Sequence, residues 1–368
     1  MIDIREAKTK KEIKEFVRYP QNLYKDCPYY VPSLESVDYD TITNHPAKEF
    51  CEIKLWMAYK NGKIAGRIAG IINKKYNELK CKKRIRFGWF DIENDTEVAK
   101  MLLKTVGNWG IENGLDQISG PSRFSNMEKQ GMLIEGFDRI PTISAEYNYP
   151  YYPEFMDKFG FEKEVDYVQY LIELKEIPEK IKRLSESVLK RYDIKIKEFK
   201  DKKELLSYAR DFFLTLNDSF IDIYNFIPLT GPEIDYMIKN NLSMADKDLV
   251  CVLTDKDERI VGFGFNINSL NKAFQKAKGK LFPFGWYHIK KALKSNDSVD
   301  LYLNGVLPEW LNRGLSAAYH YQQHKIFLEK GFKYAVTTQQ LEDNVASRIW
   351  EKYDSEIIMR RRCYVKSL

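Results

Sequence analysis

The sequence predicts two tandem α/β domains, more narrowly α+β, each with a mixed, mostly antiparallel sheet flanked by helices. The 368 residues suit two domains, and the hydrophobic fraction of 44% can form a core in each. An internal repeat supports this: residues 55–72 and 249–267 each contain an apolar run, a polar turn and a second apolar run with the pattern I-[AV]-G. We expect domains at 1–178 and 190–368, with the boundary near a short helix rich in Lys, Glu and Ser.

The first copy opens on a helix-like N-terminus and continues with the hairpin. Asn61-Gly62 is a strong signal for its tight turn. Gly114 is placed to end the following helix in a left-handed C-cap. After the hairpin we expect a strand at 85–92, a helix at 97–112, a strand at 116–120, a helix at 153–159 and a strand at 165–174.

The second copy repeats this order. Its hairpin turn lies at 255–258, and Gly331 takes the place of Gly114. A hairpin followed by a β-α-β crossover gives a mixed sheet with helices on both faces. We expect a strand at 193–199, a helical region at 202–217, a strand at 299–306, a helix at 314–330, a strand at 334–339, a helix at 344–353 and a strand at 357–365.

Composition excludes several classes of protein. No stretch approaches 18 consecutive apolar residues, and the N-terminus has no apolar signal-peptide core. The five cysteines form no CxxC pair, so we expect reduced thiols in a cytoplasmic protein. No HExxH motif is present, so we expect no metal, and His320 and His324 are interpreted as a solvated helix face.

The segment 299–316 carries the most chemical information. Its strand places Asp300, Tyr302 and Asn304 on one face by alternation. After Pro308, an Arg313-Gly314 turn opens directly into a long helix. The first N–H groups of a helix lack partners and carry partial positive charge, and glycine lets a phosphate approach them closely. The segment therefore predicts an anion site, although neither a Walker loop nor a GxGxxG fingerprint is present.

This segment resembles the acyl-coenzyme A loop of the GNAT acetyltransferase superfamily. That loop follows a strand ending V-x-P and has the form [QR]-x-x-G-x-[GA]. Here Gly314 matches, Ser316 is a small replacement for the last position, and Leu311 replaces the usual Gln or Arg. The resemblance implies acetyl-CoA or another acyl-CoA as co-substrate. The implied coenzyme contacts are Val306, Leu307, Asn312, Arg313, Gly314, Leu315, Ser316 and Asn344.

The whole chain also resembles a group of bacterial GNAT-like proteins of this length, through motifs such as Gly120-Pro121, 148–152 and 281–286. In the first copy, the corresponding turn after Asp91 has no Arg-Gly pair and is acidic. Acids there would repel a diphosphate. We therefore expect the N-terminal domain to bind no coenzyme.

The resemblance implies direct acyl transfer from the coenzyme to an amine. Glu309, Asp300 and Glu342 are candidate bases, and a carboxylate suits this role only if burial raises its pKa. Trp350 stands where the family usually has its thiol-protonating Tyr, which leaves Tyr353 as a substitute. The acceptor pocket is expected to involve Tyr302, Asn304, Tyr149 and Tyr151.

The function expected from these residues is an acyl-CoA-dependent N-acyltransferase acting on a small-molecule or peptide amine. Two alternatives stay open: a Fem-type aminoacyltransferase using aminoacyl-tRNA, and a non-catalytic acyl-CoA-binding or interaction protein. The net charge of +6 is weak support for a tRNA groove. We expect no membrane partner and no nucleic acid, and the oligomeric state is open.

A further basic segment accompanies an aromatic one. Seven lysines between Lys272 and Lys294 have no acid among them. They are expected to be solvated, although Lys278 and Lys280 could approach a coenzyme phosphate. Phe282-Pro283-Phe284-Gly285-Trp286 is expected to bury the loop against a sheet, or otherwise to cover the pantetheine arm.

Overall fold

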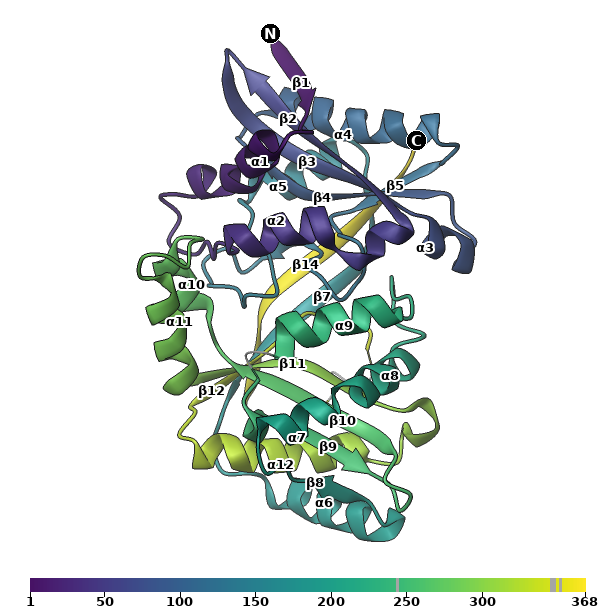
Figure 1. Ribbon diagram of the computed structural model, residues 1–368, viewed down its shortest axis with the longest axis vertical. Helices are drawn as coiled ribbons and strands as arrows, with labels where there is room; N and C mark the ends of the chain where they lie inside the picture. The colour runs from purple at the N-terminus through teal and green to yellow at the C-terminus, as the bar shows by residue number, and fades with distance from the viewer. Residues whose placement is uncertain (243–244, 345–348, 351–352) are drawn as a thin grey trace. The chain divides into compact units, whose positions relative to one another are not determined.

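The computed structural model describes residues 1–242, 245–344, 349–350 and 353–368 (Figure 1). The chain forms two compact units. Unit 1 comprises Met1–Val168, Leu270–Lys290 and Ile358–Leu368, and unit 2 comprises Gln169–Ser269 and Lys291–Ile357. These segments alternate along the chain, whereas the domains expected from the sequence are two continuous stretches.

The sheet of unit 1 has six strands in its main path. Neighbouring strands are antiparallel except for one parallel pair, β4 with β5. The turn of the β2–β3 hairpin has positive φ angles at Asn61 and Gly62, as its sequence predicts. In spatial order the strands are β1 (Ile2–Glu6), β2 (Cys51–Lys60), β3 (Lys63–Asn73), β4 (Arg84–Ile92), β5 (Gln117–Gly120) and β14 (Ser355–Ser367), and β6 (Met132–Glu135) also pairs with β14.

Helices cover both faces of this sheet. On one face Leu102 of α4 packs with Ile68 and Phe87, and on the other Phe16 of α1 packs with Met57. Because helices cover both faces of the sheet, the apolar residues of β3 and β4 are buried on each face. The helices of unit 1 are α1 (Lys10–Leu23), α2 (Glu35–Asn44), α3 (Lys74–Leu79), α4 (Thr96–Glu112), α5 (Tyr151–Lys158), α10 (Asn271–Ala277) and the start of α11 (Gly285–Lys294).

The sheet of unit 2 repeats this arrangement. Its neighbouring strands are again antiparallel except for one parallel pair, β11 with β12. The spatial order is β8 (Lys195–Lys197), β9 (Val250–Thr254), β10 (Ile260–Asn268), β11 (Ser298–Val306), β12 (Tyr334–Thr337) and β7 (Glu162–Glu173), and β13 (Gln340–Leu341) also pairs with β7. The duplication that the repeated hairpin predicts is therefore present in the strand order and directions.

The last strand of each copy joins the other copy's sheet. Residues 171–173 of β7, which follow the first copy, pair with β12 of unit 2. Residues 364–367 of β14, which end the second copy, pair with β5 of unit 1. A local apolar pattern predicts a strand but does not specify its sheet, so this exchange could not be read from the sequence.

Helices also cover both faces of the sheet in unit 2. Leu315 and Tyr319 of α12 pack with Val188 of α6 on one face. On the other, the Phe212 ring of α8 lies 4.3 Å from that of Phe263. The helices are α6 (Glu179–Tyr192), α7 (Lys202–Ser207), α8 (Ala209–Ser219), α9 (Gly231–Asn241) and α12 (Leu315–Glu329). The mixed sheet with helices on both faces confirms the predicted fold class.

The prediction for the two helical histidines is wrong. His324 is buried, and its Nε2 lies 2.8 Å from the backbone oxygen of Lys175. The ring of His320 lies 4.7 Å from that of Trp350. Burial lowers the pKa of both imidazoles, so they pack as neutral rings. Within the described ranges, no group of His, Cys, Asp and Glu is arranged to hold a metal ion, and no helix is long and apolar enough to cross a membrane.

Candidate functional site

Strand β11 contains a bulge at Tyr302. Leu303 pairs with Phe265 and Leu301 with Asn266, which leaves Tyr302 as the extra residue. The bulge shifts the alternation of side chains along the strand. Asp300 pairs with Ile267, whereas Asn304 pairs with Gly264, which faces Tyr319 of α12.

The expectation that Asp300, Tyr302 and Asn304 share one face is therefore wrong. Leu301 packs with Phe327 of α12, so the adjacent Asp300 points to the opposite face, where α8 lies. Asn304 points to the α12 face. The Tyr302 ring packs edge-on against Phe265, with the centroids 5.8 Å apart. No residue type in the sequence signals this bulge.

Strands β11 and β12 separate beyond the bulge. They pair in parallel from Ser298 with Tyr334 to Leu301 with Thr337. The Thr338 hydroxyl then donates to the backbone oxygen of Tyr302 at 3.0 Å. Strand β12 ends at Thr337, whereas β11 continues to Val306. The last residues of β11 therefore have an edge that β12 does not cover.

A tight turn joins β11 to α12. Leu307 is buried and its N–H donates to Val261 O at 3.0 Å, which fixes the end of the strand. A short 3-10 turn at Pro308–Trp310 follows. Asn312 and Gly314 then adopt left-handed φ angles of 62° and 84°, and Gly314 is the N-cap of α12. The predicted geometry of strand, glycine turn and helix is present.

The start of α12 has no cap: among the described residues, no side chain forms a hydrogen bond that caps this helix. Ala317 N–H donates to Gly314 O at 3.0 Å, but across the described part of the chain the amides of Gly314, Leu315 and Ser316 have no hydrogen-bond acceptor. N–H groups without partners at a helix N-terminus are chemically suited to bind an anion.

Arg313 adds a cation beside these amides. Its guanidinium lies 4.9 Å from the Trp310 ring centroid and 5.7 Å from that of Tyr192. Arg313, Asn312 and Leu311 are exposed. A guanidinium held by flat rings retains its N–H groups for an anion.

The candidate base Asp300 lies in a fully buried position. Its side chain is 0% exposed, and neither carboxylate oxygen has a hydrogen-bond partner among the described residues. Burial raises the pKa of Asp300 to about 7, and the nearby Ser269 hydroxyl lowers it only in part. By contrast, Glu309 is exposed and forms an ion pair with Arg259 at 3.1 Å. Asp300 is therefore the carboxylate whose surroundings suit proton transfer near neutral pH.

Trp350 and Tyr353 pack on the α12 face of the sheet. Trp350 is buried with Val299 and Leu301, and its Nε1 donates to Gln340 at 2.9 Å. The Tyr353 ring stacks on His324, with the centroids 5.6 Å apart. Its hydroxyl is buried without a hydrogen-bond partner in the described ranges, and burial raises the pKa of Tyr353 to about 12.

The other predicted residues are more scattered. Asn344 lies in a turn where its N–H donates to Leu341 O at 3.0 Å, and Glu342 is exposed in the same turn. Residues 345–348 and 351–352 lie outside the described residues, so most of the predicted helix at 344–353 cannot be compared. Tyr149 and Tyr151 belong to unit 1, where their rings stack 5.6 Å apart and the Tyr151 hydroxyl donates to Ile92 O at 2.7 Å.

In unit 1 the corresponding helix N-terminus, that of α4, is capped by the side chain of Asp95. Asp95 is the N-cap of α4 and accepts hydrogen bonds from the N–H groups of Glu97 and Val98 at 3.1 and 3.3 Å. Lys60 forms an ion pair with the same carboxylate. The amides that would bind a diphosphate are therefore already occupied by a negative charge.

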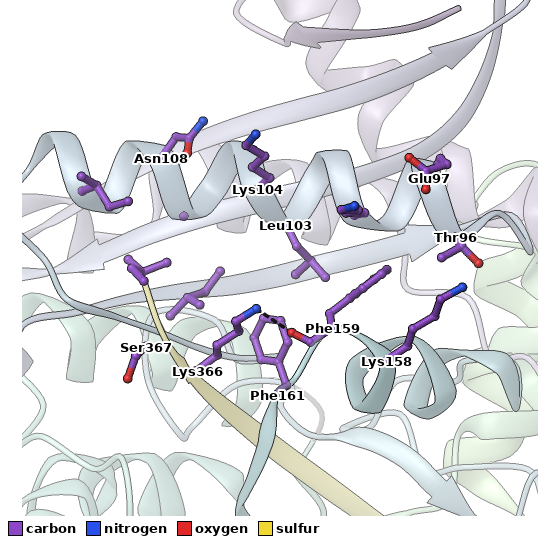
Figure 2. Close-up of a pocket in the computed structure, with 15 residues that line it drawn as sticks. Thr96, Glu97, Leu103, Lys104, Asn108, Lys158, Phe159, Phe161, Lys366 and Ser367 are labelled. Atoms are coloured by element: carbon purple, nitrogen blue, oxygen red, sulfur yellow. Dashed lines mark hydrogen bonds between the residues drawn. The ribbon is translucent and has the colours of Figure 1, made fainter.

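Unit 1 also contains a pocket of about 510 Å³ beside α4. Figure 2 shows Leu103, Phe159 and Phe161 in its walls, with Lys104 and Lys158 around it. The Lys366 ammonium donates to the backbone oxygen of Phe159. The pocket lies along the length of α4, and its Thr96 and Glu97 end is where Asp95 caps the helix.

The doubled mixed sheet with helices on both faces is similar to that of solved structures described as GNAT proteins. A tandem GNAT protein from the clavulanic acid biosynthesis pathway has a similar structure, with a TM-score of 0.56, 8% identity, and coverage of 100% of this chain and 98% of that one. A GCN5-related N-acetyltransferase from Sphaerobacter thermophilus has a TM-score of 0.53 and 13% identity, with coverage of 100% and 95%. These similarities establish the fold.

Two proteins are also similar in sequence. Protein YghO of Escherichia coli K12 is 26% identical over 295 residues, which cover 79% of this chain and 74% of YghO. The bacterial ceramide synthase of Caulobacter vibrioides is 27% identical over 304 residues, which cover 78% and 75%. No protein-family model matches the chain.

Proposed function

We propose that this chain is an acyl-CoA-dependent N-acyltransferase whose coenzyme binds unit 2 at the start of α12. The observation that carries the proposal is the contrast between the two equivalent helix N-termini. In unit 2 the amides of Gly314, Leu315 and Ser316 have no acceptor among the residues that the structure describes, whereas in unit 1 Asp95 caps α4. A doubled fold with one open and one self-capped turn favours one coenzyme site for the chain.

The same turn accounts for how an acyl-CoA would lie. Its diphosphate would accept hydrogen bonds from the amides at 314–316, with Arg313 providing the positive charge. The arm that ends in the thioester would follow the edge of β11 that β12 leaves uncovered. Tyr302 lies four residue steps along the strand from Val306, which is roughly 13 Å. The reacting carbonyl would therefore lie near the bulge at Tyr302, two residues along β11 from Asp300.

The chemistry then needs two protons removed from nitrogen and one delivered to sulfur. Asp300 takes the first proton from the ammonium form, and the neutral amine attacks the thioester carbon. The carbon–sulfur bond breaks in the tetrahedral intermediate, and Tyr353 gives its proton to the leaving thiolate. The nitrogen releases its second proton to solvent, from which the Tyr353 phenolate is reprotonated, so that an amide and free coenzyme A are formed. Asp300 and Tyr353 lie toward opposite faces of the sheet. This arrangement suits an amine and a coenzyme that reach the β11 edge from different faces.

The name of one sequence relative favours a long-chain acceptor. A ceramide is an amide of a fatty acid and a long-chain amino alcohol, and one relative bears the name bacterial ceramide synthase. We extend the proposal to an acceptor of this class, a long-chain amino alcohol, with a fatty acyl-CoA as donor. The attacking group is an amine in either case, so the roles of Asp300 and Tyr353 do not change.

The test is thermal unfolding followed by thiol release. A ligand that binds the folded state raises the unfolding midpoint, so palmitoyl-CoA or acetyl-CoA should raise it and total tRNA should not. Thiol release should then require an amine, with sphinganine preferred over short amines. A midpoint shift with tRNA alone would favour the Fem-type alternative. A coenzyme shift without thiol release from any amine would favour the non-catalytic alternative.

A further inference from the structure

An exposed aromatic segment runs from the end of α10 into the first turn of α11, the two helices labelled together in Figure 1. We call residues 278–287 the aromatic loop. Phe282 is 78% exposed, Phe284 is 71% exposed and Trp286 is 46% exposed. The expectation that this segment packs against a sheet fails at the two phenylalanines, because their rings are exposed. The alternative, that the segment covers a pantetheine arm, stays a prediction. Such exposure of adjacent large apolar side chains indicates an interaction surface.

The loop is held in position by unit 1. Glu35 N–H donates to the backbone oxygen of Gly279 at 2.8 Å, and the Gln275 amide donates to that of Pro28 at 2.8 Å. Within the loop, Trp286 Nε1 donates to Pro283 O at 2.9 Å. The exposure of Phe282 and Phe284 is therefore a property of an anchored loop.

Lysines lie within the aromatic loop and flank it along the chain. No Asp or Glu occurs between Lys272 and Lys294, and the five lysines of this stretch that belong to unit 1 are all exposed. They form no ion pair with any described residue. These five are Lys272, Lys276, Lys278, Lys280 and Lys290. The surface therefore combines apolar rings with uncompensated positive charge.

We propose that the aromatic loop docks unit 1 on an anionic phospholipid bilayer. Phe282 and Phe284 would enter the boundary between headgroups and acyl chains, and Trp286 and Tyr287 would lie at headgroup level, where amphipathic rings are favoured. The five lysines would contact anionic headgroups, and each one near such a surface strengthens binding about fivefold. This proposal replaces the expectation of no membrane partner and does not rest on the proposed acyl transfer.

Charge argues against a second copy of this chain as the occupant, and the type of cation argues against a nucleic acid. A symmetric pairing of two copies would bring five lysines against five lysines around the same rings. A nucleic acid would be expected to face arginine and amide side chains that read bases or bind phosphates in pairs, and none of the five cations is an arginine. Lysines beside phenylalanines instead complement an anionic lipid surface.

The test is flotation of the full chain with vesicles, without acyl-CoA. Vesicles of phosphatidylcholine with phosphatidylglycerol should carry the protein, and pure phosphatidylcholine should carry much less. Changing Phe282→Ser with Phe284→Ser should weaken binding at least about tenfold. Changing Lys278→Glu with Lys280→Glu should weaken it at least about 25-fold and remove most of its salt dependence.

Matched controls come from elsewhere on unit 1. Leu79 and Ile111 are each 56% exposed, and Lys82 and Lys83 are exposed. Leu79→Ser with Ile111→Ser, and Lys82→Glu with Lys83→Glu, should leave vesicle binding within about twofold of wild type. Trp286 fluorescence should shift to the blue with anionic vesicles, and Trp286→Phe should remove that shift while binding remains.

Four results would overturn the proposal. The wild type could remain unbound to anionic vesicles, or the phenylalanine and lysine pairs could behave like their controls. The phenylalanine pair could abolish a concentration-dependent dimer in sedimentation while vesicle binding is absent, which would assign the loop to self-association. A single-stranded oligonucleotide could bind in place of vesicles through the same residues. Circular dichroism of each variant separates these results from misfolding.

Discussion

The buried carboxylate of Asp300 makes a prediction that couples stability to activity. Burial raises its pKa to about 7, against an ordinary value of 3.8. At 1.36 kcal/mol per pH unit, holding this group ionised in the folded chain costs about 4 kcal/mol. Because the folded state binds the proton more tightly than the unfolded state, this cost is absent below pH 4, grows as the pH rises, and is constant above pH 7.

Changing Asp300→Asn removes the titration but keeps the shape of the side chain. The gain in unfolding free energy over wild type should be about 3 kcal/mol larger at pH 8.5 than at pH 4.5. Any penalty from the buried amide is the same at both pH values and cancels in this comparison. Urea unfolding of both proteins, followed by circular dichroism, measures it. The same variant should lose about 10²- to 10⁴-fold in kcat if Asp300 is the base.

The reasoning is refuted if the difference in unfolding free energy between D300N and wild type is the same at both pH values. That result would mean that Asp300 titrates near its ordinary range in the folded chain. If the pH-dependent difference is present but kcat is unchanged, Asp300 is a buried acid without a catalytic role, and Glu342 becomes the next candidate for the base.

Three further predictions concern the two helix N-termini and the acid. Gly314→Val places a Cβ 3.0 Å from Val188 Cγ2 at a φ of 84°, so the coenzyme-induced rise in unfolding midpoint should be lost; Gly331→Val, at a φ of 78° with nothing within 4 Å, should keep it. Asp95→Ala removes the cap of α4 and should cost about 1 kcal/mol of unfolding free energy in urea titrations, with an unchanged coenzyme shift; a larger coenzyme shift would show that unit 1 can also bind. Tyr353→Phe should lower kcat about 100-fold with the coenzyme affinity unchanged by calorimetry, and an unaltered kcat would remove Tyr353 from the mechanism.

The elements of the fold follow closely from local patterns. Asn61-Gly62 predicts the first hairpin turn, and Gly114 and Gly331 predict the helix ends, because each needs a left-handed backbone that glycine or asparagine adopts at low cost. The parallel β4–β5 and β11–β12 pairs follow from the β-α-β order. The exchange of β7 and β14 does not follow, since the same apolar strand could complete either sheet.

The site is only partly predictable from the sequence. The alternating strand followed by Arg313-Gly314 and a helical pattern predicts the strand, the Gly314 turn and the uncapped helix N-terminus. The bulge at Tyr302 does not, and it reverses the face on which Asn304 lies. The burial of Asp300 and the exposure of Phe282 are set by tertiary contacts, which a hydrophobic pattern within the segment does not report.

A crystal structure with bound coenzyme A tests the central claim most directly. The account predicts the diphosphate at the turn before α12, with its oxygens about 3 Å from the backbone nitrogens of Gly314, Leu315 and Ser316 and near the Arg313 guanidinium. The thiol should lie beside β11 near Tyr302. Coenzyme bound at the start of α4, or along the pocket of unit 1 with the α12 turn empty, would contradict it.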